Sequence, residues 1–478
     1  MRGPCCCLSI PELSPMRDLP LAAVHPERGG GQDVFYPWEA PVPRPLITRA
    51  KGIHLWDQTG KEYIDLSSGP VVSNIGHGNE VVAEVMSRQA RQVDFAYFSH
   101  ARHEPNIDLA ERIAELAGPG YERVCFSSGG SEAIECAVKF LRHYAVSMGE
   151  PKRRKLITCY PSYHGATMAT LAMSGDHDIA PFLDGMIEPS LKVPAPLSYR
   201  LPPNHTAETY ARHCADALEA CIRRAGAETI LGFFIEPVGG LATGCNVPVP
   251  EYFARVREIC TRYGIALVFD EVLCGTGRTG KFLAAHNWPE AMPDIVVMAK
   301  GLGSGYTPLG ATLIPARMAD TLAASVGFGF FHTYSANPIS CAAAIAVLDE
   351  YERLDVIRHG EVMGRYLREQ LEGLKTSSQV VGDIRGMGLL MALEVVTDKA
   401  SKGVFPPEVS PVDLLKLAGL RNGLLVYGRR TASGRNGDWI MVSPPMIITR
   451  QECDELMRRL TAMLADFEAD VRDKGMLR

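Results

Sequence analysis

Residues 264–310 read GIALVFDEVLCGTGRTGKFLAAHNWPEAMPDIVVMAKGLGSGYTPLG. The segment contains two short runs rich in valine and isoleucine, Ile265–Phe269 and Ile295–Ala299, and each has the length of a buried parallel strand. The first run ends at Asp270 and the second at Lys300, although such strands rarely carry charges into a core. Because ligands of open parallel sheets bind beyond the carboxyl ends of the strands, we expect the acid and the lysine to share one site.

The composition is ordinary for a globular protein, and it excludes several classes of function. The 478 residues suffice for one large domain and a smaller one, and 46% apolar and 22% charged residues are typical of water-soluble domains. A net charge of −6 gives no electrostatic footprint for nucleic acid or for an anionic membrane. No uncharged run reaches about 18 residues, so we expect no transmembrane helix.

The 13 cysteines include no C-x-x-C pair, and most stand singly in apolar or helical segments, as Cys136 and Cys341 do. This pattern predicts reduced, buried thiols in a cytoplasmic protein, with neither a disulfide framework nor a metal site. No apolar region follows Cys5-Cys6-Cys7, so we expect no secretory signal, and Met16 is an alternative start.

The periodicity of the chain predicts one large α/β domain and a smaller domain built from both chain ends. Residues 1–45, rich in proline and glycine, are expected to form a partly mobile arm. Residues 46–78 contribute a hairpin to the smaller domain, 79–340 form the large domain with a mostly parallel sheet, and 341–478 complete the smaller domain. Outside 264–310, the expected strands are Gly52–Asp57, Glu62–Leu66, Val124–Phe126, Lys155–Cys159, Thr229–Ile235, Leu389–Val395 and Ile440–Val442. The expected helices are Asn106–Ala117, Glu132–Tyr144, Cys341–Leu354, Leu367–Leu374 and one that begins at Arg450.

Gly275–Gly280 form a literal G-x-G-x-x-G, and with Lys281 they also satisfy G-x-x-x-x-G-K. A P-loop needs serine or threonine after the lysine to hold magnesium, but Phe282 follows. A dinucleotide fingerprint opens a helix directly after a strand, but Asp270–Cys274 intervene. We therefore interpret the segment as a glycine-rich loop beside a site. A nucleotide-binding protein that uses Gly275–Gly280 is the alternative from another class of function.

Asp270 and Lys300 form either a buried salt bridge or a functional pair. Burying an ion pair costs several kcal/mol of desolvation per ion, and packed apolar residues often stabilise a core equally well, which favours the functional interpretation. A lysine with a pKa lowered by desolvation forms Schiff bases, and an acid can hold the protonated ring nitrogen of pyridoxal phosphate. Gly129-Gly130-Ser131 lies between a strand and a helix, where backbone N–H groups and the Ser131 hydroxyl would bind a phosphate. A tight turn with a serine N-cap is the alternative there.

Together with other landmarks, these residues closely resemble the class III (omega) family of pyridoxal-phosphate-dependent aminotransferases. The resemblance extends from about Gly52 to Thr449. Its landmarks are LWDQTGKEYIDLSSG (55–69), Ser128–Ala133, Tyr163-His164-Gly165, Glu236-Pro237-Val238, Asp270-Glu271-Val272, AKGLGSGYTPLG (299–310), HTYSANP (332–338), Arg385–Gly388 and Ser443-Pro444-Pro445. The resemblance implies an aspartate-aminotransferase-like fold (PLP fold type I), with a seven-stranded sheet in the large domain.

The resemblance also implies roles for individual residues. Lys300 would be the Schiff-base lysine and the base that moves the substrate proton, and Asp270 would be the partner of the cofactor's ring nitrogen. His164 would only shape its loop. Thr333 would reach the phosphate of the partner subunit, which implies a homodimer, or a dimer of such dimers, with shared sites. The residues that the resemblance assigns to cofactor binding are Gly130, Ser131, Tyr163 and Val272 on the two ring faces, Asp270, Lys300 and Thr333.

Departures from the family pattern concern the substrate. Members that bind an α-carboxylate carry an arginine at the position of Met441, so Glu236 lacks its usual partner here. This favours the branch that acts on amines or β/ω-amino acids, in which an arginine earlier in the same loop binds a carboxylate bidentately. The candidates are Arg429, Arg430 and Arg435, and for each of them a solvated surface arginine is the alternative.

Two further departures alter the cavity itself. Gly129 stands where many members carry serine, and Pro70 and Val71 stand where the family has an aromatic pocket residue. The expected reaction is a ping-pong, Schiff-base transamination from an amine or a β/ω-amino acid to a 2-oxo acid, with pyruvate as the favoured acceptor. The sequence leaves the donor undetermined. An aminomutase or decarboxylase of the same fold is the alternative, and a cofactor-free binding module is a third possibility.

Overall fold

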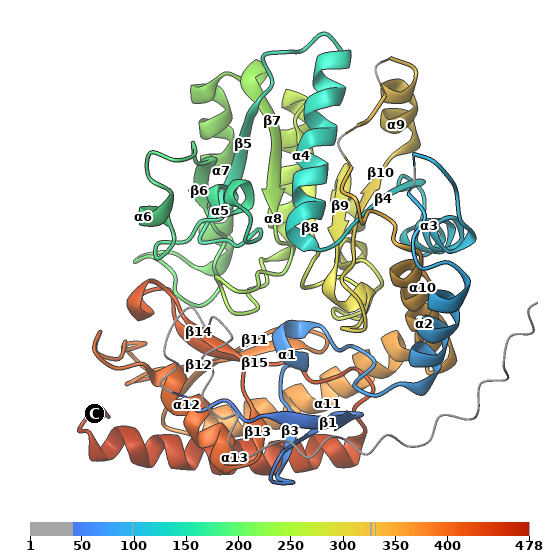
Figure 1. The fold of residues 1–478 in the computed structure, drawn as a ribbon. Coiled ribbons are helices and arrows are strands. Elements are labelled where there is room, and N and C mark those ends of the chain that lie inside the picture. Colours follow the sequence, from blue (N-terminus) through green and yellow to red (C-terminus); the bar gives the residue numbers. More distant parts are fainter. Residues whose placement is uncertain (1–41, 98, 326, 330, 478) are drawn as a thin grey trace, which may run out of the picture. The chain divides into compact units, whose positions relative to one another are not determined.

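Seven strands form the central sheet, in the order β4-β10-β9-β8-β7-β5-β6 (Figure 1). Only β10 runs antiparallel to its neighbours, and the other neighbouring pairs are parallel. The expected α/β sheet with mostly parallel strands is therefore confirmed. The bounds are β4 (Arg123–Ser127), β5 (Lys155–Tyr160), β6 (Leu191–Pro194), β7 (Ile230–Ile235), β8 (Ala266–Asp270), β9 (Ile295–Met298) and β10 (Gly310–Ile314).

The computed structural model describes residues 42–97, 99–325, 327–329 and 331–477. All elements named here lie in the unit Arg44–Arg478, so the arm expected over residues 1–45 falls almost wholly outside the described residues. Within the described part, no helix combines the length and the apolar character that crossing a bilayer requires. The ten cysteines of this part are free thiols, and all but Cys125 are buried.

Helices cover both faces of the sheet, because successive side chains of a strand point to opposite sides. On β7, Phe234 belongs to the buried cluster formed with α4 and α9, whereas Phe233 belongs to the cluster formed with α7 and α8. Figure 1 shows α4 crossing one face of the sheet, with α7 and α8 on the other side. The helices of this layer structure are α3 (Glu104–Ala117), α4 (Gly130–Ser147), α5 (Met168–Met173), α6 (Ala180–Leu183), α7 (Ala207–Ala225), α8 (Pro250–Tyr263) and α9 (Ala316–Ala323).

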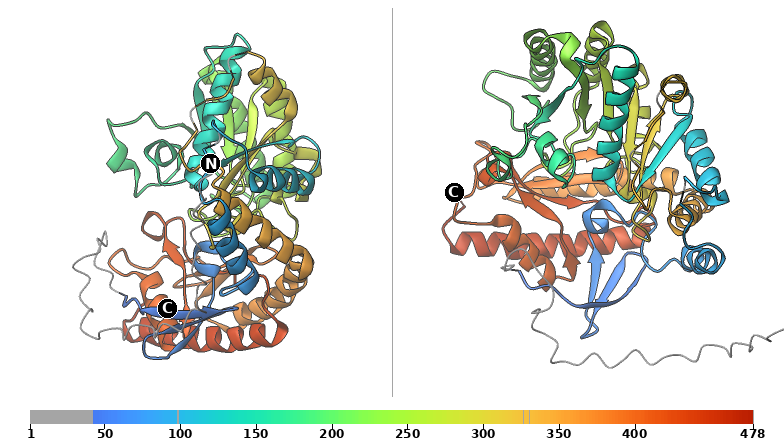
Figure 2. Two further views of the ribbon diagram at one scale, coloured as in Figure 1. Left: turned by 45° about the vertical axis from the view of Figure 1, so that its right-hand side comes forward. Right: turned by 45° about the horizontal axis from the view of Figure 1, so that its top comes forward.

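The two ends of the chain build two further four-stranded sheets, ordered β1-β2-β3-β13 and β11-β12-β15-β14. Strand β13, from the C-terminal part, pairs in parallel with β3, and these blue and red segments lie together in Figures 1 and 2. The bounds are β1 (Ile47–Lys51), β2 (His54–Asp57), β3 (Glu62–Asp65), β11 (Val381–Met387), β12 (Leu390–Val395), β13 (Leu424–Leu425), β14 (Gly428–Arg430) and β15 (Asp438–Val442). The remaining helices are α1 (Ser68–Val71), α2 (Glu80–Gln92), α10 (Pro338–Arg353), α11 (Val356–Ser377), α12 (Pro411–Arg421) and α13 (Arg450–Asp473). A smaller α+β part built from both chain ends is thus confirmed, while the domain boundaries after residues 78 and 340 stay predictions.

Six strands were not predicted from the sequence: β1, β6, β10, β11, β13 and β14. Strand β6 ends at Pro194 on the edge of the sheet, a position where proline removes no needed hydrogen bond but weakens the strand signature. Strand β10 has only five residues, all buried, and begins with Gly310, so it shows neither alternation nor length. A cis peptide bond joins Tyr160 to Pro161 at the end of β5.

Candidate active site

A cavity of about 430 Å³ opens at the carboxyl edge of the seven-stranded sheet. Parallel strands end at the same edge of a sheet, so the loops that follow β4, β5, β7, β8 and β9 all reach this cavity. The structure brings together seven of the residues singled out in the sequence as lining residues: Gly130, Ser131, Tyr163, Glu236, Asp270, Val272 and Lys300. Thr333, Arg429 and Arg430 are not among the lining residues.

Asp270, the last residue of β8, is paired with a histidine. Its Oδ2 lies 2.9 Å from Nδ1 of His164, and its Oδ1 accepts a hydrogen bond of 3.1 Å from the backbone N–H of Val272. Both side chains are almost fully buried, at 5% exposure for Asp270 and 0% for His164. An imidazole N–H that donates to a carboxylate fixes the orientation of both groups. His164 therefore does more than shape a loop, because it orients the acid in the cavity.

Lys300 begins a short 3-10 turn, Lys300–Leu302, and has a left-handed φ of +45°. Burial lowers the pKa of its ammonium group, and the carboxylates of Asp270 and Glu236 act in the opposite direction. The next residue must be glycine, because a Cβ on Gly301 would lie 2.2 Å from the side-chain nitrogen of Asn74. The lysine is thus held in an uncommon backbone conformation by its neighbours, as is typical of functional positions.

The turn between β4 and α4 carries hydrogen-bond donors that could hold an anion. Gly129 caps α4 without a side-chain hydrogen bond, so the first N–H groups of this helix have no side-chain acceptor at the cap. The hydroxyl of Ser131 accepts a hydrogen bond of 3.0 Å from the N–H of Ala166, which leaves its own proton available to an anion. A Cβ on Gly130 would lie 2.8 Å from Cγ1 of Val272, so the turn packs directly against that side chain.

Glu236 holds the tyrosine of the cavity by its backbone. Its Oε2 accepts a hydrogen bond of 2.9 Å from the N–H of Tyr163, and its Oε1 accepts one of 2.8 Å from the N–H of Gly240. Burial raises the pKa of Glu236 to about 7, although the two amide donors lower it. The acid that lacks an arginine partner in the sequence therefore has two backbone partners in the structure.

The three candidate arginines have different surroundings. Arg429, on β14, forms an ion pair through Nη2 with Asp176, and its charge lowers the pKa of the cavity tyrosines Tyr163 and Tyr427, which burial raises. Arg430 forms an ion pair of 3.6 Å with Asp438 and donates to the carbonyl groups of residues 405, 406, 409 and 433, so it holds the loops on both sides of it. Arg435 is exposed and donates to a carbonyl in its own turn. Only Arg429 is placed electrostatically beside the cavity.

Sequence reasoning missed several residues of the cavity wall. Tyr427 and Leu241 line the cavity but stand in segments without a motif, and Thr307 does so next to the lysine loop. At the position where the family has an aromatic pocket residue, Pro70 lines the cavity as expected, whereas Val71 is buried in the core and the lining residue is Val72. The turn around residue 70 contains several left-handed residues, which the sequence signals only through Gly69.

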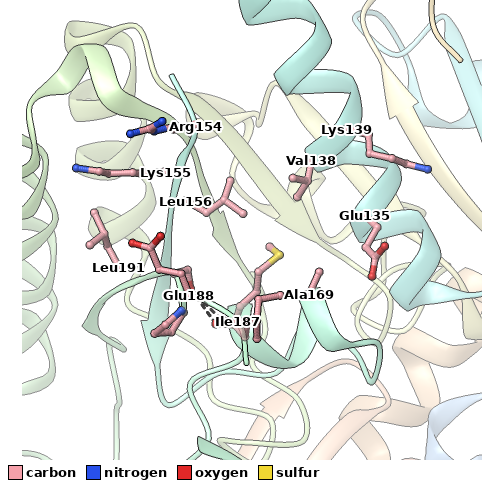
Figure 3. A pocket seen from close by; sticks show the side chains of 14 residues that line it. Glu135, Val138, Lys139, Arg154, Lys155, Leu156, Ala169, Ile187, Glu188 and Leu191 are labelled. Atoms are coloured by element: carbon pink, nitrogen blue, oxygen red, sulfur yellow. Dashed lines mark hydrogen bonds between the residues drawn. The ribbon is translucent and has the colours of Figure 1, made fainter. Parts of the chain in front are cut away.

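A second cavity of about 540 Å³ lies beside α4 and β5, away from these groups (Figure 3). Figure 3 shows Arg154 and Lys155 at one side of it, above Glu188, with Val138 and Leu156 on its apolar wall. None of the site residues expected from the sequence lines this second cavity. The acid, the lysine and the anion turn meet only in the first cavity.

The residues of the first cavity fit pyridoxal phosphate. A phosphate needs several N–H or O–H donors, and the start of α4 with the Ser131 hydroxyl supplies them. The open space at Gly129, where a Cβ would meet nothing within 4 Å, leaves room for a ligand against the turn. A desolvated lysine and a buried acid complete the set of functional groups that this cofactor requires.

Comparisons with known proteins agree with this assignment. The family Aminotransferase class-III matches residues 35–464 of the chain. The diaminobutyrate–2-oxoglutarate transaminase of Halomonas elongata is 34% identical over 87% of this chain and 89% of its own length, and the putrescine–pyruvate aminotransferase of Pseudomonas aeruginosa is 31% identical over 86% and 88%. The crystal structure of an amine transaminase from an uncultivated Pseudomonas species, in its PLP-bound form, is 33% identical and superposes with a TM-score of 0.84 over 91% of this chain and 98% of that chain. The chain therefore belongs to the class III aminotransferases, transferases of PLP fold type I that depend on pyridoxal phosphate.

Proposed function

We propose that this enzyme moves an amino group from a primary amine or a β/ω-amino acid to pyruvate. The observation that carries the proposal is the state of Arg429, whose Nη1 is buried and has no hydrogen-bond partner among the described residues. Its Nη2 is held by Asp176, at the side of Tyr163 and Tyr427. A guanidinium with a spare buried donor beside the cavity can turn to bind one carboxylate bidentately.

The cations of the site support an acceptor with a single carboxylate. Within the described part of the chain, Lys300 is the only lysine or arginine that lines the cavity, and Arg429 lies beside it. At the position where an α-carboxylate would meet an arginine, Met441 is fully buried in β15. Pyruvate needs one cation, whereas 2-oxoglutarate needs two. The two named relatives divide on this point, since one uses 2-oxoglutarate and the other pyruvate.

In the proposed reaction, the residues of the cavity bind the cofactor and move one proton. Pyridoxal phosphate, when bound, supplies an electron sink that makes the Cα–H bond of an attached amine acidic. Lys300 would link the cofactor and act as the base, because desolvation lowers the pKa of its Nζ. Asp270, oriented by His164, would hold the ring nitrogen, and Ser131 would donate to the phosphate. Val272 and Tyr163 would confine the ring.

A donor panel combined with Arg429 variants tests the proposal. Purified enzyme is offered β-alanine, putrescine, an arylamine and an alkylamine, each with pyruvate or 2-oxoglutarate, and both products are measured. We expect pyruvate to be preferred, and Arg429→Leu to lower kcat/KM for pyruvate by about 100-fold. The half-reaction of a carboxylate-free amine should stay within about twofold. The exposed Arg435→Leu is the matched control. A variant of Arg429 that slows every half-reaction equally would contradict a role in carboxylate binding.

The same panel separates the alternatives within the fold. A transaminase exchanges amino groups between two substrates, and each half-reaction alone converts the whole cofactor pool once. An aminomutase would return an isomer of the donor without any acceptor, and a decarboxylase would release carbon dioxide. Either outcome in the absence of a 2-oxo acid would replace the proposed reaction.

We also propose that the enzyme is a homodimer, or a dimer of such dimers, in which Thr333 reaches the cofactor of the partner subunit. Thr333 is exposed and lies outside the cavity of its own chain, and the neighbouring Tyr334 is 64% exposed beside Phe95. Co-expressed subunits, one with Lys300→Ala and one with Thr333→Ala, test the sharing. The hybrid regains one intact site if Thr333 acts across the interface, and it regains none if Thr333 serves its own chain.

A further inference from the structure

The glycine-rich loop Gly275–Gly280 contains an arginine that turns inward, Arg278, with only 1% of its surface exposed. All five of its hydrogen bonds, at 2.6–3.3 Å, go to neutral oxygen atoms: Oγ of Ser68, Oδ1 of Asn74 and the carbonyl groups of Leu389, Ser443 and Pro444. Since no carboxylate of the described residues accepts a hydrogen bond from it, its role is not that of one half of an ion pair. A planar guanidinium is the only side chain with enough donors, in the right geometry, to hold these separate segments together.

One of these contacts leads to the wall of the active-site cavity. Nη2 of Arg278 donates to Oγ of Ser68 at 2.7 Å, within the turn Ser67–Val72. This turn is strained, because Ser68 and the β-branched Val71 have φ values of +56° and +60°. Two residues of the same turn, Pro70 and Val72, line the cavity. A strained turn keeps its shape only while its surroundings hold it, and Arg278 is one of the groups that do so.

A second contact leads to the backbone of the lysine. Nε of Arg278 donates to Oδ1 of Asn74 at 2.8 Å, and the amide of Asn74 is fully buried. The nitrogen of that amide occupies the space where a Cβ on Gly301 would stand, at 2.2 Å. Gly301 directly follows Lys300 and shares its 3-10 turn. The arginine therefore supports the lysine loop through one intermediate side chain.

We infer that Arg278 is a positioning residue of the active site: it fixes the turn Ser67–Val72 and the backbone at Lys300, and so sets which amine donors fit the cavity. This inference rests on the proposed transamination. It assigns a role in substrate selection to the glycine motif that resembles a nucleotide site, although the loop itself does not line the cavity. Arg278 does not line the cavity itself, and it acts on the residues of the cavity wall through hydrogen bonds to neutral groups.

Two variants and one matched control test the inference on the full-length holoenzyme. Ser68→Ala removes the link from Arg278 to the turn, together with the hydrogen bond of 2.8 Å that the Ser68 hydroxyl donates to the carbonyl of Ser443. Arg278→Lys removes most of the five hydrogen bonds of the arginine. Thr279→Val, in the same loop, removes a buried hydroxyl that bonds only to Asn287. For each protein we measure the melting temperature, the ratio of kcat/KM between a bulky arylamine and a small alkylamine, and the visible circular dichroism of the bound cofactor.

We expect Arg278→Lys to change the donor ratio by about tenfold and Ser68→Ala by about fivefold, while Thr279→Val stays within about twofold even where its melting temperature falls. Arg278→Lys should also alter the cofactor dichroism, because the lysine loop loses its support. The inference is overturned if Ser68→Ala and Arg278→Lys only lower the melting temperature and leave both the ratio and the dichroism as in the control. Should Arg278→Lys fail to fold, Ser68→Ala alone decides through the ratio. A wild-type enzyme without any transfer to a 2-oxo acid would refute the proposed function instead, and the dichroism would then decide on Arg278.

Discussion

The glycine-rich loops after β4 and β8 follow strands of the same sheet, but only the first of them leads into a helix whose start faces the cavity. After β4, Gly129 and Gly130 lead directly into α4, and the start of this helix faces the cavity. After β8, Gly277 has a φ of +88° and packs against Ile357, Tyr351 and Met446 of the protein itself. A glycine motif indicates that something approaches the backbone closely. At Gly130 and at Gly277 the protein's own side chains make this approach. The two loops therefore differ in the helix that begins at the first one, whose free N–H groups face the cavity.

The two adjacent acids at the end of β8 also differ in what they face: the cavity for Asp270 and the protein interior for Glu271. Asp270 points into the cavity and is paired with His164. Glu271 points away from it, and its two oxygens accept hydrogen bonds from the N–H groups of Ala284 and Ala285, beyond the second loop. One side of this strand end therefore faces the cavity, and the other side fixes the loop.

The largest expected effect tests the side of the strand that faces the cavity. Asp270→Asn should lower kcat by about 10²–10⁴-fold, because a neutral amide cannot hold a protonated ring nitrogen. The melting temperature of the apoprotein should change little, since an amide keeps the contact with the N–H of Val272. Turnover and melting curves measure the two effects. A variant that mainly unfolds would show that the pair with His164 is a structural salt bridge.

The next effect compares the two loops directly. Gly130→Ala places a Cβ 2.8 Å from Cγ1 of Val272, so the turn or the valine must shift, and cofactor binding should weaken by about 10- to 100-fold. Gly277→Ala, at a left-handed φ, should cost about 1–3 kcal/mol of folding stability and leave cofactor affinity within about twofold. Cofactor titration and denaturant unfolding measure the two quantities. Equal loss of cofactor affinity in both variants would remove the distinction between the loops.

A smaller effect concerns the pH dependence of stability. Burial raises the pKa of Glu271 from 4.5 to about 8, so the folded protein keeps a proton that the unfolded chain loses. The stabilisation is therefore complete below about pH 4.5 and is lost progressively as the pH rises toward 8. Glu271→Gln should flatten the fall in unfolding free energy of the apoprotein between pH 5.5 and 8.5. Part of the slope should remain, because the pKa of Glu236 is also raised, to about 7.

An unchanged slope in Glu271→Gln would mean that this acid is ionised in the folded protein. The exposed Glu258→Gln serves as the control, since the pKa of that side chain is lowered and not raised. The pH profile of kcat/KM should keep its shape in Glu271→Gln, because the acid lies on the side of the strand away from the cavity.

The smallest expected effect adds a group to the first loop. Gly129 has an extended backbone, with φ of 176°, and a Cβ there would meet nothing within 4 Å. Gly129→Ser should therefore be accepted and give the phosphate one more hydroxyl donor, which slows cofactor release by about fivefold. Release is measured by dialysis against a cofactor trap. Faster release than in the wild type would show that the side chain points away from the phosphate.

The sequence predicted the cavity well because each of its charged groups stands where a strand ends. Asp270 and Lys300 each end an apolar run. A charged residue is unexpected at the end of a buried strand, so the sequence alone draws attention to both. The pairing of His164 with Asp270 was not predicted, because it joins loops that are 106 residues apart. The network of Arg278 was also not predictable, since its partners come from both ends of the chain and no local pattern connects them.

The central claim is that Lys300 is the residue to which the cofactor is attached. Purified holoenzyme is reduced with borohydride, digested, and examined by peptide mass mapping. We predict that a single phosphopyridoxyl group is found on the peptide that contains Lys300, and that Lys300→Ala prepared in the same way carries none. A label on another lysine, or an equal label on the Lys300→Ala variant, would contradict the account.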